Sequence, residues 1–228
     1  MRLSELLADP DPEVRRTAAE ALGKVGHRAA SSGLNAALND QDHRVRSAAA
    51  LSLGSVGDGV NGIALVEHLA DSAEPVRAAS ALALGEMEVS TAREEQILEA
   101  LQNPKSAVRV AASRALLGLD TVSLSADLVS ALRDSNANVR QGVTAVLGET
   151  GDARALPYLL KLLKSDPDAG VRSEAAFRLG KVGDNRVVAE LSAVAARDSD
   201  MTVREWARWA VRQIMPTREF GSGTRPSR

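Results

Sequence analysis

The apolar positions of this chain recur with one period along most of its length, and each recurrence contains a Val-Arg pair. The intervals between successive pairs are 31 or 32 residues. The pairs are Val14-Arg15, Val45-Arg46, Val76-Arg77, Val108-Arg109, Val139-Arg140, Val171-Arg172 and Val203-Arg204. A period in this range indicates a solenoid, because a unit this small cannot bury its own apolar face and must stack on its neighbours.

Within each unit the apolar spacing is helical. In the first unit Val14, Ala18, Leu22 and Val25 stand at i, i+4, i+8 and i+11, which places them on one predicted helical face. Glycine corners are predicted to end such helices, since glycine adopts the left-handed conformation without strain. These glycines are Gly26, Gly57, Gly151 and Gly183. No segment alternates as a strand would, so each unit is predicted to be helix, turn, helix and corner.

This pattern predicts two helices in each of seven units. A short first helix is expected over 2–8, and later first helices near 30–38, 60–70, 91–101, 123–132, 153–164 and 185–197. Second helices are expected from Glu13 and near 44–56, 75–87, 106–119, 137–150, 169–182 and 201–215. Residues 1–215 are therefore expected to form one continuous solenoid. The segment 216–228, rich in Gly, Ser, Pro and Arg, has too little apolar content to pack and is expected to be flexible.

Composition narrows the class of protein. Only 2% of the residues are aromatic, so small aliphatic side chains must do the packing. The net charge is -2, and no global field favours nucleic acid or an anionic membrane. Cysteine is absent, and the first residues are too charged for a signal peptide or a membrane span. We expect a cytoplasmic protein without membrane association.

The repeated pattern Asp-x-x-x-x-Val-Arg-x-x-Ala-Ala-x-Ala-Leu-Gly-x-(Val/Ile)-Gly-Asp resembles the HEAT repeat, in the short variety named after phycobilisome bilin lyases. The resemblance covers residues 1 to about 215. It implies an all-α fold, an α-solenoid with a right-handed superhelix of seven helical hairpins. It also implies that the second helices, which carry Val-Arg, line the concave side. Proteins with such repeats serve as scaffolds, adaptors and binding subunits.

An acidic residue stands six positions before each arginine of the Val-Arg pairs, except in the fourth unit. A row of these side chains at fixed spacing predicts charge-assisted hydrogen bonds between stacked units. The residues are Asp9, Asp40, Asp71, Asn103, Asp134, Asp166 and Asp198. The fourth unit also has Leu117 where others have glycine, so we expect the local curvature to change there.

Candidate catalytic groups are few. HEAT-like iron hydroxylases, a related family, are recognised by His-Glu dyads, and this chain has only the reversed Glu67-His68. With His27 and His43, these histidines are expected to be solvated surface residues, because a metal site needs three or four convergent donors. No phosphate loop, nucleophile elbow or zinc spacing is present. We expect no enzyme activity, no catalytic residues, no metal and no cofactor.

The main hypothesis is a scaffold or adaptor that binds a protein or peptide along its concave face. One alternative is a bilin lyase-type subunit acting on a tetrapyrrole-bearing protein. Another is nucleic-acid binding, which needs a basic stripe. The residues expected on the concave side are mixed in sign: Arg16, Lys24, Arg44, Arg114 and Lys181 against Glu13, Glu20, Glu86, Glu149, Glu174 and Glu205. These charges cancel, so nucleic acid is not expected.

The predicted binding surface follows from the position five after each arginine and its neighbours. Exposed apolar groups beside charges are typical of an interaction surface. The candidate residues are Arg16, Glu20, Arg44, Leu51, Leu82, Val110, Arg114, Phe177, Trp206 and Trp209. Trp206 and Trp209 have a second interpretation, in which their rings cover the end of the stack in the last unit.

Overall fold

We describe the chain from a computed structural model, over residues 3–56, 62–87, 91–119, 122 and 124–215. The described residues form α-helices and short 3-10 turns, and none of them forms a strand. The first helices are α2 (Ser31–Ala37), α4 (Gly62–Glu67), α6 (Thr91–Ala100), α8 (Ala126–Ala131), α10 (Leu156–Ser165) and α12 (Val188–Arg197). The second helices are α1 (Pro12–Val25), α3 (His43–Val56), α5 (Glu74–Glu86), α7 (Ser106–Leu117), α9 (Ala137–Glu149), α11 (Ala169–Val182) and α13 (Met201–Ile214).

The predicted helices are confirmed, with ends shifted by a few residues. The main difference lies in 3-10 turns that begin or end several first helices, such as His68–Ala70 after α4. The others are Glu5–Ala8, Arg28–Ala30, Ala153–Ala155 and Asn185–Val187. The helix expected over 2–8 is thus one 3-10 turn in its described part. The segment 216–228 and Gly57 lie outside the described residues.

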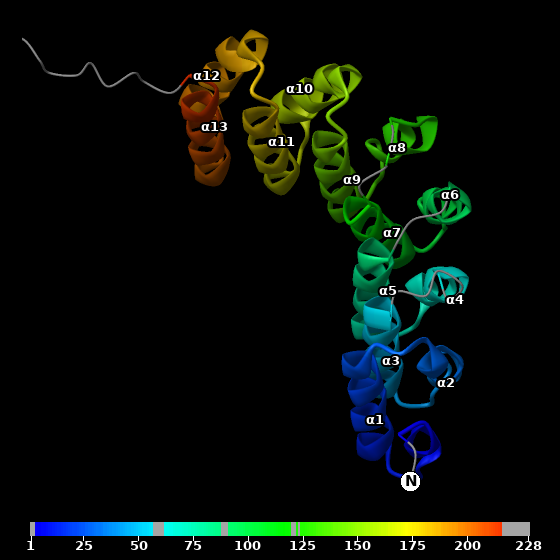
Figure 1. Cartoon of the computed structure of the whole chain (residues 1–228). Helices are drawn as coiled ribbons and strands as arrows, with labels where there is room; N and C mark the ends of the chain where they lie inside the picture. The colour runs from blue at the N-terminus through cyan, green and yellow to red at the C-terminus, as the bar shows by residue number, and fades with distance from the viewer. Residues whose placement is uncertain (1–2, 57–61, 88–90, 120–121, 123, 216–228) are drawn as a thin grey trace, which may run out of the picture. The chain divides into compact units, whose positions relative to one another are not determined.

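The chain divides into two compact units, residues 1–155 and 156–228, which are described separately. In the first unit the helices form two layers (Figure 1). Successive second helices, α1, α3, α5, α7 and α9, contact one another in one layer. The first helices α2, α4, α6 and α8 form the other layer, and each packs on the second helix that follows it. This two-layer stack of hairpins is an α-solenoid arrangement.

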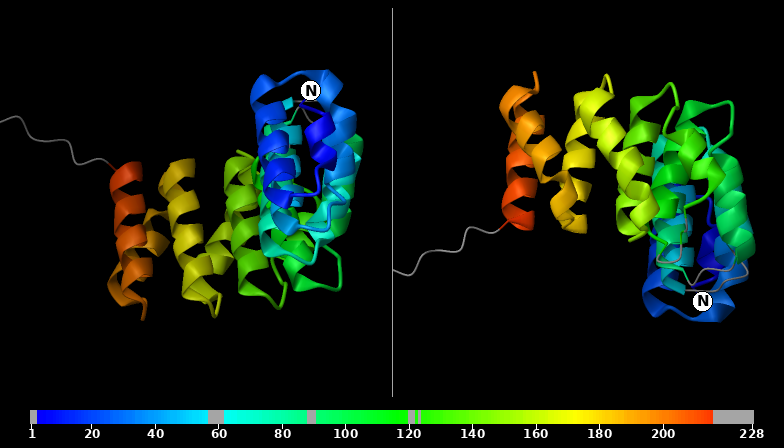
Figure 2. Two further views of the ribbon diagram at one scale, coloured as in Figure 1. Left: turned by 90° about the horizontal axis from the view of Figure 1, so that it is seen from below. Right: turned by 90° about the horizontal axis from the view of Figure 1, so that it is seen from above.

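The second unit repeats the arrangement with two hairpins. Helix α10 packs on α11 and α12 on α13, while α11 and α13 lie side by side (Figure 2). The last second helix therefore has one neighbour of its own kind among the described residues of this unit.

Small residues set the distance between second helices. A Cβ atom added at Gly54 would lie 2.8 Å from the Cα atom of Ala83, and one at Gly180 would lie 2.8 Å from the Cα atom of Ala210. Real Cβ atoms do not approach main chain so closely, so each of these positions requires glycine. Around these contacts leucines fill the core; Leu53, Leu84 and Leu179 are fully buried. The low aromatic content is explained by this close helix packing.

The predicted row of Asp and Arg residues is confirmed between units of the repeat. The Nε and Nη2 atoms of Arg15 donate to the Asp40 carboxylate at 2.6 and 2.8 Å, while its Nη1 donates to the main-chain oxygen of Asp9 at 2.8 Å. The same bidentate contact joins the pairs Arg46–Asp71, Arg109–Asp134 and Arg172–Asp198. Each arginine thus links its own turn to the next one.

These contacts lower the pKa of the aspartates. Hydrogen bonds from Arg15 lower the pKa of Asp40, and those from Arg172 lower the pKa of Asp198. At Asp71 partial burial opposes ionisation, but hydrogen bonds from Arg46 and from the main chain outweigh it, so the pKa is again lowered. The pKa of Asp134 is lowered by the same balance of burial against hydrogen bonds. We call this row of paired arginines and aspartates the ladder. Because the aspartates are stabilised in their ionised form, the ladder stabilises the stack.

The contacts of the fourth unit differ from those of the other units. Arg77 donates to the main-chain oxygens of Asp71 and Ser72, at 2.7 and 2.9 Å, but it contacts no carboxylate among the described residues. Asn103 keeps the turn, since its Oδ1 accepts from the Lys105 main-chain N–H at 3.0 Å. Leu117 stands where other units have glycine, and the close contact between α7 and α9 is made at Gly142, where an added Cβ atom would lie 2.2 Å from the Ser113 Oγ atom.

Two expectations for individual residues were wrong. Val25 does not share the buried face with Leu22, because it is the last residue of α1 and 62% exposed, next to the left-handed Gly26. His68 is not a solvated residue. Its Nδ1 lies 2.7 Å from the Ala64 oxygen and its Nε2 lies 2.8 Å from the Leu38 oxygen, so it bridges neighbouring hairpins.

Candidate protein-binding surface

The exposed side of the second-helix layer in the first unit carries two large apolar side chains. Leu51 of α3 is 40% exposed and Leu82 of α5 is 55% exposed. Two residues along a helix turn the side chain by about 200°. Leu51 therefore points away from Ala49 and Leu53, which are fully buried. The same reasoning applies to Leu82 between Ser80 and Leu84. Neither leucine belongs to the core.

The other predicted residues of this unit also reach the surface. Arg44 and Arg114 are exposed, and Arg16, Glu20 and Val110 are partly exposed. We name this set of seven residues the second-helix face: Arg16, Glu20, Arg44, Leu51, Leu82, Val110 and Arg114. It extends over α1, α3, α5 and α7.

Every arginine of the second-helix face has a carboxylate partner. Arg16 donates to Glu13 at 2.9 Å and also pairs with Glu20. Arg44 links Glu13, at 2.5 Å, to Asp42, at 2.7 Å. Arg114 lies 3.7 Å from Glu74. The cancellation of charge expected from the sequence is therefore local, and the face presents apolar groups between ion pairs.

The second unit carries an aromatic cluster made of Phe177, Trp206 and Trp209. The ring centroids of Phe177 lie 5.2 Å from those of both tryptophans, and the two tryptophans are 5.5 Å apart. The guanidinium of Arg178 lies 5.1 Å from the Phe177 centroid. The three rings pack α11 against α13, and the Phe177 ring makes a cation–π contact with Arg178.

The two tryptophan rings differ in how deeply they are packed. A Cβ atom at Gly180 would lie 2.8 Å from the ring of Trp209, so that ring packs closely against α11. Trp206 is 38% exposed. Trp209 thus contributes to the packing between helices, whereas much of Trp206 remains accessible to a partner.

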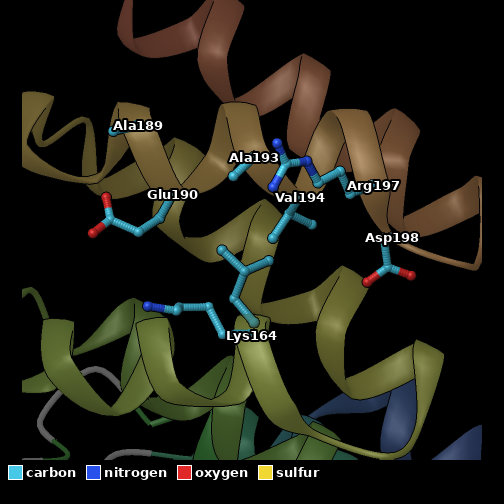
Figure 3. Close-up of a pocket in the computed structure, with 8 residues that line it drawn as sticks. Lys164, Ala189, Glu190, Ala193, Val194, Arg197 and Asp198 are labelled. Carbon is cyan, nitrogen blue, oxygen red and sulfur yellow. The ribbon is translucent and has the colours of Figure 1, made fainter.

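A groove between α10 and α12 was not predicted. It has a volume of about 500 Å³ and is lined by Leu163, Lys164, Ala189, Glu190, Ala193, Val194, Arg197 and Asp198. The side chains of Lys164 and Glu190 extend towards the same end of this groove (Figure 3). The Oε2 atom of Glu190 is shielded from solvent without a hydrogen-bond partner among the described residues. The repeat pattern does not predict this groove, because the groove depends on how α10 and α12 pack against each other.

Among the described residues, no group of three or more His, Asp or Glu side chains is placed to hold a metal ion. None of the described helices combines the length and the apolar character needed to cross a bilayer.

The repeats match a known family. The sequence profile of HEAT repeats matches residues 1–85 and 125–212. The chain belongs to the HEAT-repeat family. The unmatched residues 86–124 include Asn103 and Leu117, where the repeat pattern is broken. No curated protein sequence matches the chain.

Solved HEAT-like structures support the α-solenoid. YibA of Escherichia coli is 23% identical, with a TM-score of 0.58 over 93% of this chain and 79% of that one. The archaeal HEAT-like repeats protein from Thermococcus onnurineus NA1 is 14% identical, with a TM-score of 0.58 over 93% of this chain and 95% of that one. The complex of CpcE and CpcF of phycocyanin lyase from Nostoc sp. PCC7120 is 22% identical, with a TM-score of 0.55 over 93% and 85%. At these identities the likeness concerns the fold.

Proposed function

We propose that this HEAT-repeat protein is a non-catalytic scaffold that binds a protein or peptide on its second-helix face. The exposure of Leu51 and Leu82 carries the proposal, because these leucines are not required by the core. The surrounding ion pairs favour a protein partner over nucleic acid. A phosphate backbone would have to displace Glu13, Glu20 and Glu74 from their arginines.

The aromatic cluster supports the same function in the second unit. Tryptophan beside arginine is the composition most enriched among residues that dominate binding energy. Trp206 is the accessible member of the cluster. The cytoplasmic location and the absence of enzyme activity belong to this proposal and rest on the sequence.

The test compares two exposed aliphatic residues of the first unit. Leu82 lies on the second-helix face and Ile63 lies on α4, in the other layer; they are 55% and 60% exposed. Leu82→Glu should weaken binding of a partner purified from native lysate by about 30-fold, which corresponds to about 2 kcal/mol. Ile63→Glu is the matched control and should leave affinity unchanged. Both variants should retain wild-type helicity and Tm, since neither side chain is in the core.

Titration calorimetry with the purified partner measures both variants. Loss of binding in Ile63→Glu but not in Leu82→Glu would place the surface on the first helices and refute the proposal. Visible absorbance of the retained complex is recorded in the same experiment. A coloured complex would favour the bilin lyase-type alternative, whose fold is similar.

A further inference from the structure

Helix α13 has a row of arginines on one face. Arg204, Arg208 and Arg212 are spaced four residues apart, so they fall within about 80° of one another around the helix. No carboxylate among the described residues pairs with any of the three. Like charges at this spacing repel one another, so the row attracts a group of opposite charge. We name these three residues the α13 arginine row.

Arg204 is held in the same way as the ladder arginines. Its Nη1 donates to the main-chain oxygens of Asp198 and Ser199, at 2.7 and 3.0 Å. Arg15 has the same anchor, to Asp9 and Pro10 at 2.8 and 3.1 Å, and in addition binds Asp40 through Nε and Nη2. The Nε and Nη2 edge of Arg204 is therefore positioned for a carboxylate that the described residues do not supply.

The other two arginines replace small residues of the repeat. The position four after the Val-Arg arginine is occupied in the earlier units by Ala19, Ala50, Ala81, Ser113, Thr144 and Ala176. The position eight after it is occupied by Gly23, Gly54, Gly85, Leu117, Gly148 and Gly180. In α13 these positions carry Arg208 and Arg212. A Cβ atom at Gly180 would already meet the Cα atom of Ala210 at 2.8 Å, so Arg212 cannot make the close contact that Gly180 makes.

A shallow groove lies beside this row. It has a volume of about 470 Å³ and is lined by Ser192, Ala195, Ala196, Arg208, Val211 and Arg212. Its floor is aliphatic, from α12 and α13, and its charged groups are the two arginines. A segment with an apolar side and acidic side chains would complement both.

We propose that the α13 arginine row and this groove bind an acidic segment of a partner protein, with Arg204 holding one carboxylate in the bidentate geometry of the ladder. This surface is separate from the second-helix face. A second copy of this chain could not repeat the close contact that Gly54 and Gly180 make, because Arg212 stands at that position in α13. Duplex DNA fits less well, because the row spans only about 12 Å and is flanked by Glu205.

The test uses a fluorescein-labelled helical peptide of about 20 residues with glutamate at every fourth position, and the same peptide with glutamine instead. Anisotropy at about 50 mM salt limits screening of the charges. The glutamate peptide should bind the full chain and the glutamine peptide should not. Arg208→Gln/Arg212→Gln should weaken binding about tenfold. Arg204→Lys keeps the charge but loses the bidentate fork, so it should also weaken binding.

The matched control is Arg28→Gln/Arg133→Gln, which removes the same charge from two other exposed arginines. It should change affinity less than twofold, and all variants should keep wild-type helicity. Equal binding of the two peptides, or an equal loss in the control, would overturn the proposal. Tighter binding of duplex DNA through the same arginines would overturn it in favour of nucleic acid. Self-association that disappears in Arg208→Gln/Arg212→Gln, seen by sedimentation, would overturn it in favour of a second copy.

Discussion

The missing carboxylate at Asn103 provides a direct test of the ladder. Arg77 is already anchored to the main-chain oxygens of Asp71 and Ser72, and Asn103 already has the turn hydrogen bond to Lys105. Asn103→Asp changes one atom of the side chain and places a carboxylate at the register that Asp40, Asp71 and Asp134 occupy. The substitution should therefore create the bidentate contact without rearranging the main chain and should stabilise the protein.

The magnitude follows from the existing pairs. Their arginine side chains are 12–16% exposed and their aspartates 9–10% exposed, so water screens them only in part. Hydrogen bonds to charged groups contribute about 1.5–3 kcal/mol, whereas exposed ion pairs contribute about 0–1 kcal/mol. Desolvation of the new carboxylate offsets part of the gain. We expect about 1 kcal/mol, which corresponds to a rise in Tm of about 2–4 °C for a domain of this size.

Urea unfolding followed by circular dichroism measures the change, as a higher midpoint at an unchanged m-value. The same substitution in an Arg77→Gln background is the control, because a double-mutant cycle isolates the pairwise energy. The gain should disappear there. A gain that persists without Arg77, or a loss of stability at pH 7, would refute the ladder as the cause.

Two further predictions concern the ladder and the aromatic cluster. Because the folded-state pKa of Asp40, Asp71, Asp134 and Asp198 lies below that of the unfolded chain, about 3.9, their contribution is complete above that value and is lost as pH falls through the folded-state values. Urea midpoints from pH 6 to 2 should fall mainly below about pH 4, and a constant midpoint would contradict this. Trp209→Ala should cost about 2 kcal/mol or more, since its ring packs on Gly180, and Trp206→Ala about 1 kcal/mol. Calorimetric melting compares them, and equal losses would mean that Trp206 contributes to the packing as much as Trp209 does.

Much of the fold was predictable because the same helical pattern occurs seven times in the sequence. Helix α11 begins and ends at the predicted residues, Ala169 and Val182. The exposure of Leu51 and Leu82 followed from the same periodicity, since helical spacing assigns each residue to a side. The bidentate contacts were predictable in kind, because an acidic and a basic residue at fixed spacing meet when units stack.

Features that depend on how helices meet were not predictable. Leu117 at the usual glycine position predicted a change of local curvature, but it did not show that the close contact between α7 and α9 would lie at Gly142, where an added Cβ atom would be 2.2 Å from the Ser113 Oγ atom. His68 bridges two carbonyl groups, which requires knowing that Leu38 lies beside it. On the candidate surface, opposite charges were expected to cancel over the whole face. Their pairing within particular triads, such as Glu13, Arg16 and Glu20, depends on side-chain rotamers.

In the units that have glycine eight residues after the arginine, this position sets how closely the next second helix can approach. Where glycine stands eight residues after the arginine, as at Gly54, the next helix approaches until only hydrogen fits between the main chains. A side chain at Gly54 would separate α3 from α5, so the core around Leu53 and Leu84 could not close. Arg212 holds the equivalent position in α13. A partner at that face meets the long charged side chains of Arg208 and Arg212, and such contacts select a partner by charge more than by shape.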